Sequence, residues 1–288
     1  MHLQEKKFQY IAHRFTKSST LEILPFTTEN FTYSLSDGTI LYPTHEVKDL
    51  GVNVTSDLSW AVHIATAAAK GRSMASWVFS AFLTRERSCM MILYKSLVRS
   101  HLEYCCVLWD PRNIGLIQQL EAVQRTFTSK IWGVSHLNYW DRLKALGLMS
   151  LQRRRERYAL LHMWKILNNK CPNDAHISFL PISRSGILAK VPSLVRNSSC
   201  HNQSIYDQSF AVVGPTLWNS IPGHLHGIGE QQRFKIQLTK FLTTIPDKPP
   251  VSGYCRSNDN SILDWAKNKN AAALRGRSDD VMSLKSLL

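Results

Sequence analysis

The chain has 288 residues, of which 44% are hydrophobic, and a formal net charge of +14. This apolar content is ordinary for a globular protein and excludes wholesale disorder, while no apolar run approaches the roughly 20 residues that cross a bilayer. The opening stretch "MHLQEKKFQY" carries charge where a secretory signal needs an apolar segment. We therefore expect an intracellular protein, cytoplasmic or nuclear, with no membrane partner.

Residues 1–57 are predicted to form short strands. "FTYSLSDGTILYP" alternates around Asp37-Gly38, which is typical of a hairpin turn because glycine tolerates a positive φ. "VKDLGVNVT" predicts a further strand with Gly51 inside it, as a bulge or a close approach of another backbone.

Residues 58–170 show the periodicity of helices. The first apolar face is expected to comprise Ile64, Ala68, Gly71, Ala75, Val78 and Phe82. A second face should comprise Met90, Leu93, Leu97, His101, Tyr104 and Leu108, with Cys105 and Cys106 packed nearby as small apolar residues. A third should comprise Leu116, Leu120, Val123, Phe127 and Ile131, with Gln118, Glu121 and Arg125 on the opposite side.

Capping residues delimit two more helices in this region. Asn138 is a predicted N-cap and Gly147 a predicted stop, and the next helix begins after Ser150. Its packing face should contain Leu160, Met163, Trp164 and Leu167.

The C-terminal part is predicted to be less regular. A connection rich in Ser, Asn and Pro extends to about residue 202, and "YDQSFAVVGPTLWNSIP" suggests a strand leading into a helix that begins near Pro215. Another helix is expected near 230–244. The predicted divisions are 1–57, 58–170, 171–246 and a peripheral tail over 247–288. The fold class is α+β, mainly α: a small β-rich N-terminal part, a helical bundle and an irregular C-terminal region.

The positive charge is concentrated in the helical part of the chain. Residues 58–170 hold 17 Lys and Arg against six Asp and Glu. Arg153, Arg154 and Arg155 lie in the first turns of a helix, where the helix dipole disfavours cations, so an anion bound nearby would explain them. The candidate nucleic-acid-binding residues are Arg125, Lys130, Arg142, Lys144, Arg153, Arg154, Arg155 and Arg157. The alternative is a solvated, merely basic surface.

Catalytic and metal-binding patterns are absent from the sequence. The six cysteines show neither C-x-x-C nor zinc-finger spacing, and Cys200-His201 with His224 and His226 lacks a matching partner. The one adjacent acidic pair, Asp279-Asp280, fits a helix start better than a two-metal site. We expect no catalytic residue, no cofactor and no small-molecule substrate.

Five blocks of the sequence resemble, in order and spacing, the C-terminal part of the reverse transcriptase of jockey-like non-LTR retrotransposons. They are "VKDLGVNVTSDLSWAVHI", "LYKSLVRSHLEYCCVLWDP", "LEAVQRTFTSKIWG", "LNYWDRLKALGLMSLQRRRERYALLHMWKILN" and "FAVVGPTLWNSIP". The resemblance covers roughly residues 5–250. It implies the end of the palm at "EKKFQYIAHRF", a primer-grip-like hairpin containing Asp49, Leu50 and Gly51, and a thumb from about Leu58 onward.

The resemblance also implies what this chain should lack. The family copies RNA into DNA with Mg²⁺, and its paired aspartates precede everything present here. We therefore expect a truncated, non-catalytic remnant that binds RNA or DNA, as a duplex and without sequence preference. The alternatives are part of an RNA-directed DNA polymerase that is active only when the missing palm is supplied, and a non-functional product that folds poorly.

Overall fold

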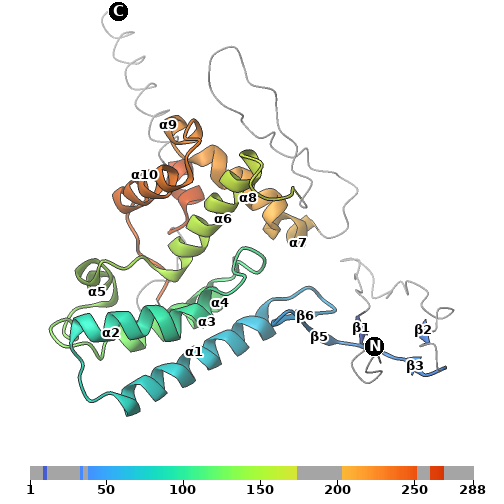
Figure 1. The fold of residues 1–288 in the computed structure, drawn as a ribbon, viewed down its shortest axis with the longest axis horizontal. Coiled ribbons are helices and arrows are strands. Elements are labelled where there is room, and N and C mark those ends of the chain that lie inside the picture. The colour runs from blue at the N-terminus through green and yellow to red at the C-terminus, as the bar shows by residue number, and fades with distance from the viewer. Residues whose placement is uncertain (1–8, 12–32, 35–37, 174–202, 252–259, 269–288) are drawn as a thin grey trace, which may run out of the picture.

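The computed structural model describes residues 9–11, 33–34, 38–173, 203–251 and 260–268 (Figure 1). Within these residues the fold is mainly helical, with small two-stranded sheets on the N-terminal side, which confirms the predicted fold class. In the same residues, no helix is both long enough and apolar enough to cross a membrane. The connection predicted up to residue 202 and the Asp279-Asp280 pair lie outside the described residues.

Among the described residues, three two-stranded sheets precede the helices. β1 (Tyr10–Ile11) is parallel to β4 (Pro43–Thr44), while β2 (Tyr33–Ser34) pairs antiparallel with β3 (Ile40–Leu41), as the predicted hairpin requires. β5 (Glu46–Asp49) and β6 (Val52–Thr55) form a second antiparallel hairpin. The prediction of a single strand with Gly51 inside it is wrong: Leu50 (φ 44°) and Gly51 (φ 90°) form the turn, and a two-residue hairpin turn of this kind requires a positive φ at both positions.

Two groups of helices follow. The first comprises α1 (Ala61–Ala81), α2 (Arg87–Leu93), the π-helical η3 (Tyr94–Val98), α3 (Arg99–Glu103), α4 (Ile114–Thr128), α5 (Tyr139–Leu146) and α6 (Leu151–Leu167). The second comprises α7 (Gln203–Gln208), α8 (Phe210–Ser220), α9 (Gly223–His226) and α10 (Gln231–Thr244). A further helical stretch covers residues 262–268.

The predicted face of α1 is confirmed over most of its length. Ile64, Ala68, Gly71, Ala75 and Val78 are all buried. At Gly71 a Cβ atom would lie 2.9 Å from Leu102 Cδ2 and 3.3 Å from Val123 Cγ1. A glycine is therefore needed where α1 packs closely against α3 and α4.

The predicted face of the second helical segment is shifted. The buried positions are Met90, Met91, Tyr94, Val98 and Leu102, whereas Tyr104 and Leu108 are exposed. The inward face departs from the prediction already at Tyr94, where the π-helical turn begins. This turn is wider than an α-helical turn and keeps Val98 and Leu102 on the same face. The helix also ends at Glu103, so the expected helical placement of the two cysteines is wrong: Cys105 is exposed with φ 51°, and Cys106 is buried.

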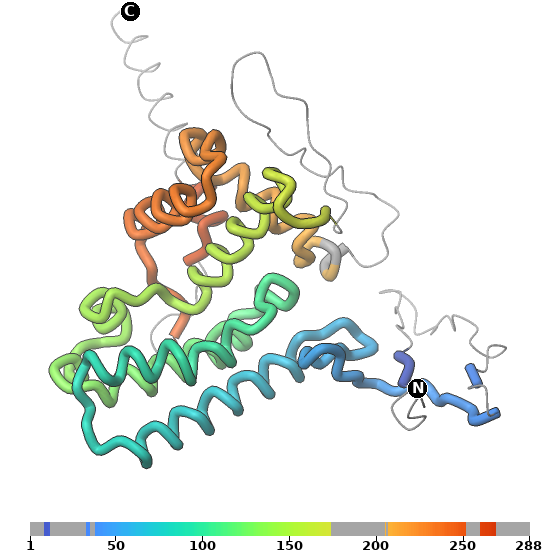
Figure 2. Tube along the Cα trace, viewed as in Figure 1, coloured from blue at the N-terminus to red at the C-terminus, as the bar shows by residue number. Residues whose placement is uncertain are grey.

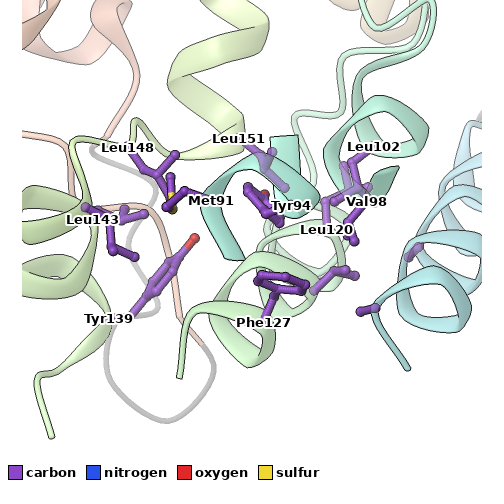
Figure 3. Packing of buried hydrophobic residues seen from close by; sticks show 14 of the residues in the cluster. Met91, Tyr94, Val98, Leu102, Leu120, Phe127, Tyr139, Leu143, Leu148 and Leu151 are labelled. Atoms are coloured by element: carbon purple, nitrogen blue, oxygen red, sulfur yellow. The ribbon is translucent and has the colours of Figure 1, made fainter. Parts of the chain in front are cut away.

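The apolar interior has two parts, and α6 belongs to both. The first core lies among α1–α5, where Figure 3 shows Tyr94, Leu120 and Phe127 together; the rings of Tyr94 and Phe127 are 5.0 Å apart. The second core joins the C-terminal half of α6 to α8, α10 and the 262–268 stretch. Figure 2 shows α6 passing from the first group of helices to the second.

The C-terminal region is more regular than the sequence predicts. The described residues 203–214 contain no strand; α8 begins at Phe210, and Pro215 lies inside it. Burial of Val213, Leu217 and Trp218 against the second core outweighs the one backbone hydrogen bond that Pro215 cannot make. The helix predicted near 230–244 is confirmed as α10.

The segment after α10 is not entirely peripheral. Val251 is 4% exposed and Ile262 is fully buried, so described parts of residues 247–268 enter the interior. The prediction of a peripheral tail from residue 247 is wrong for these residues. Val251 lies beside Tyr139 and Trp140, and Ile262 binds Glu156, and these partners are too far away in the sequence to be recognised from local composition.

Candidate nucleic-acid interface

The three arginines at the start of α6 are internal. Ser150 caps this helix, and its Oγ accepts a hydrogen bond from the Arg153 N–H at 3.0 Å. Arg153 and Arg155 are each 1% exposed, and the Arg154 side chain is 16% exposed. The prediction of a phosphate-binding surface on these three residues is therefore wrong, and so is the alternative of a solvated charged face.

Arg153 binds the C-terminal segment. Its Nη2 donates to the carbonyl oxygens of Asn260 at 2.6 Å and Pro246 at 3.1 Å. Its Nε lies 3.6 Å from Glu156 Oε2. Glu156 in turn accepts from Ser261 Oγ at 2.6 Å. The buried guanidinium thus fastens α6 to the chain that follows α10.

The next two arginines bind acids of the first helical group. Arg154 forms a two-pronged pair with Glu103, through Nε and Oε1 and through Nη2 and Oε2 at 2.9 Å. Arg155 Nε donates to Asp110 Oδ1 at 2.7 Å. These ion pairs offset the unfavourable helix dipole. They do not satisfy every donor, because Nε and Nη1 of Arg153 and both Nη atoms of Arg155 are buried without a hydrogen-bond partner.

Glu121 belongs to the same buried network, although the sequence places it on the outer side of α4. It is 2% exposed and accepts from the Gln152 N–H at 2.9 Å and from the Tyr139 hydroxyl at 2.6 Å. Burial raises the pKa of Glu121 to about 7, against the opposing effects of the Tyr139 hydroxyl and the Arg155 charge. Burial also raises the pKa of Glu156 to about 7. The helical spacing of apolar residues did not predict the burial of Glu121 or Glu156, because α4 and α6 are covered on more than one side.

Two further candidates also serve the fold. Arg142 is 6% exposed, and its guanidinium donates to the carbonyl oxygens of Leu137 at 2.6 Å and Arg125 at 3.3 Å. Arg157 is half-buried and donates from Nε to Thr239 Oγ1 at 3.2 Å. Burial lowers the pKa of Arg157. Arg142 therefore closes the end of α4, and Arg157 joins α6 to α10.

Three of the predicted cations reach the surface. Lys130 and Lys144 are exposed, and Arg125 is partly exposed. Arg125 lies in the last turn of α4, Lys130 follows that helix, and Lys144 lies on α5. Figure 1 shows α5 at the end of the first helical group where α1 leads into α2. Arg87, which is exposed, donates from Nη2 to the carbonyl oxygen of Ala145, beside Lys144.

We call this end of the molecule the basic corner and define it by Arg87, Arg125, Lys130, Lys144, Trp77 and Trp132. The backbone N–H of Trp132 donates to the Arg85 carbonyl oxygen at 2.9 Å, which joins the segment after α4 to the α1–α2 turn. Trp77 is 55% exposed and Trp132 is 62% exposed. The sequence did not indicate this grouping, because its members come from four separate segments.

Acidic groups near the basic corner are engaged with their own neighbours. Glu86 accepts from Ser88 Oγ at 2.7 Å, and Asp141 accepts from Asn138 Nδ2 at 2.6 Å. Both hydrogen bonds are local and leave these acids exposed. The corner thus carries four cations against two acids, an excess that favours anionic ligands.

Asp49, Leu50 and Gly51 lie at the opposite end of α1. Leu50 is 85% exposed, and its carbonyl oxygen accepts from the Tyr104 hydroxyl at 2.8 Å. A Cβ on Gly51 would lie 3.4 Å from the Tyr104 ring, so the hairpin turn rests on this side chain. The 21 residues of α1, about 30 Å of helix, separate the hairpin from the basic corner. The two sets of predicted site residues are therefore not brought together.

No metal site emerges in the part of the chain that the structure describes, where no group of three or more His, Cys, Asp or Glu side chains could hold an ion. His226 Nε2 instead lies 2.8 Å from the Trp218 carbonyl oxygen. The Cys200-His201 pair lies outside the described residues.

Comparison with known proteins gives no assignment. The chain matches no protein-family model, no curated protein and no solved structure. Its origin in the reverse-transcriptase family therefore stays a prediction from the five sequence blocks.

Proposed function

We propose that this chain is a non-catalytic nucleic-acid-binding protein that resembles the C-terminal part of a non-LTR retrotransposon reverse transcriptase. It binds RNA or DNA without sequence preference through the basic corner. The supporting observation is that Arg87, Lys130, Lys144, Trp77 and Trp132 are all exposed on segments that meet at the α1–α2 turn. The Trp132–Arg85 backbone hydrogen bond and the Arg87–Ala145 hydrogen bond join these segments. Cations neutralise phosphates whatever the base sequence, and aromatic rings accept any base.

A binding titration at several salt concentrations tests this proposal. We expect the affinity for an oligonucleotide to fall steeply with salt, with a slope set by about three or four phosphate contacts. Lys130→Glu and Lys144→Glu should each weaken binding. Lys165→Glu and Lys170→Glu make the same charge change at exposed sites in and just after the last turn of α6 and serve as matched controls. Equal losses in all four variants would show general attraction to a basic protein instead of a site.

A second candidate is a part of an RNA-directed DNA polymerase that needs a palm from another polypeptide. It is favoured by the short β-sheets, since β5 and β6 pair only with each other among the described strands and leave open edges. Mg²⁺-dependent primer extension should then require both this chain and an added palm polypeptide. Absence of extension from the mixture would remove this candidate.

A further inference from the structure

Two tryptophans at the basic corner present large apolar faces to solvent. Trp77 lies on the last turns of α1, and Trp132 follows the end of α4. Their exposed fractions of 55% and 62% are unusual for the largest apolar side chain, which is buried on average. Both remain exposed although two apolar cores are available within the same chain.

The backbone that carries these rings is well anchored. Arg85 closes the end of α1 by donating to the carbonyl oxygens of Phe79 at 2.8 Å and Thr84 at 2.9 Å. Its guanidinium lies 5.0 Å from the centre of the Phe79 ring, which stacks on Phe127 of α4 at 4.8 Å. The corner is thus fixed to the first core.

Each tryptophan is tied to this anchored turn. The Trp77 ring meets the Phe82 ring edge-on at 6.4 Å, and the backbone N–H of Trp132 donates to the Arg85 carbonyl oxygen. Phe82 and Arg85 belong to the same α1–α2 turn. Before any ligand binds, the Trp77 ring therefore has an aromatic neighbour and the backbone that carries Trp132 is held in place. Both features lower the entropic cost of stacking on these side chains.

We infer that the basic corner takes single-stranded nucleic acid in preference to a duplex, with unpaired bases stacked on Trp77 and Trp132 and the backbone phosphates beside Lys130, Lys144 and Arg87. This inference rests on the proposed function and narrows its ligand. A duplex offers its phosphates equally well, but its base faces are covered by their neighbours, so it gives the indoles no partner along its length. A single strand supplies both phosphates and open base faces.

Two substitutions separate stacking from charge attraction. Trp77→Leu and Trp132→Leu keep an apolar side chain and remove the aromatic face. Both positions are more than half exposed, so folding should be preserved, and far-UV circular dichroism checks it. Tyr42→Leu is the matched control, because Tyr42 is 75% exposed and precedes β5, at the opposite end of α1 from the corner.

The measurement is fluorescence anisotropy with labelled single-stranded and double-stranded oligonucleotides of equal length. We expect the wild-type protein to prefer the single strand, and each tryptophan variant to bind it about 5- to 100-fold more weakly. Duplex affinity should change less than about twofold, and Tyr42→Leu should change neither affinity.

The failures of the two proposals are distinguishable. Equal affinity for the single-stranded and the double-stranded oligonucleotide, unaffected by the tryptophan substitutions but lowered by Lys130→Glu, would overturn the inference and leave the proposed function standing. No binding of either oligonucleotide at low salt would overturn both.

Discussion

Arg153, Arg154 and Arg155 show how residue type and residue role diverge in this protein. Three consecutive cations in the first turns of a helix normally indicate an anion, yet each of these side chains is matched by a group of the protein itself. The partner Glu103 lies 51 positions from Arg154, and Asp110 lies 45 positions from Arg155. The three arginines do break the helix-dipole rule, but their counter-groups belong to the protein and not to a bound anion.

The first prediction concerns the buried guanidinium of Arg155. Arg155→Ala should lower the free energy of unfolding by about 3–5 kcal/mol, because it leaves Asp110 without its cation and opens a cavity. Urea denaturation measures this change. Lys165→Ala, at an exposed position of the same helix, should cost less than about 0.5 kcal/mol. A similar small effect for both variants would show that Arg155 is not structurally required.

The second prediction concerns the pH dependence of stability. Burial raises the pKa of Glu121 in the folded protein to about 7, above its usual value of 4.5. The stability that its protonated form contributes is fully present below about pH 4.5 and is lost as the pH rises through about 7. We expect this group to lower the free energy of unfolding by about 3 kcal/mol between these limits.

Glu121→Gln tests this assignment, because glutamine stays neutral over the whole range. Urea denaturation should show a smaller loss of stability between about pH 5 and about pH 8 in the variant than in the wild type. Part of the slope should persist, since the pKa of Glu156 is also raised to about 7. Parallel pH profiles for the two proteins would contradict the prediction.

At the scale of elements, local signals located several helices and missed others. Asn138, Gly147 and Ser150 set the ends of α5 and the start of α6 as predicted, because capping is a local interaction. The predicted inward face of the second helical segment is displaced by one residue from the observed face, because the spacing of apolar residues does not reveal a π-helical turn. α8 was missed in part because Pro215 normally marks a helix start.

The third prediction tests the close packing of α1. Gly71→Leu should lower the free energy of unfolding by about 1–3 kcal/mol or more, because the new side chain collides with Leu102 and Val123. Thermal and urea denaturation measure the loss. Ala69→Leu places the same side chain on the exposed side of the same helix and should be nearly neutral. If both variants were equally stable, the close approach at Gly71 would be refuted.

At the scale of the whole molecule, α6 couples two apolar cores through a polar junction. Its N-terminal half binds α3, the turn at Asp110 and the segment after α10, while its C-terminal half packs in the second core. Asp247 completes the junction by accepting from the Ser150 N–H and Oγ, both at 2.7 Å. The two cores should therefore unfold together.

The fourth prediction follows from this junction. Asp247→Ala should lower the free energy of unfolding by about 1–3 kcal/mol, because the buried side chains of Ser150 and Asn260 lose their partly buried acceptor. Tryptophan fluorescence and far-UV circular dichroism should report one shared transition in the wild type. Asp264→Ala removes an acid whose partner Lys267 is exposed and should change stability little. Separate transitions in the wild type would mean that the cores are independent.

The sequence by itself determined the mainly helical fold class, the capped ends of α5 and α6, and the inward face of α1. Each of these depends on residues within a few turns of one another. Only the tertiary structure decided which cations reach solvent, because the partners of Arg153 and Arg155 come from positions 107 and 45 residues away. Folding buried the arginine triplet and left Lys130 and Lys144 exposed, since burial of a charge is tolerated only where a distant segment supplies its counter-charge or acceptor.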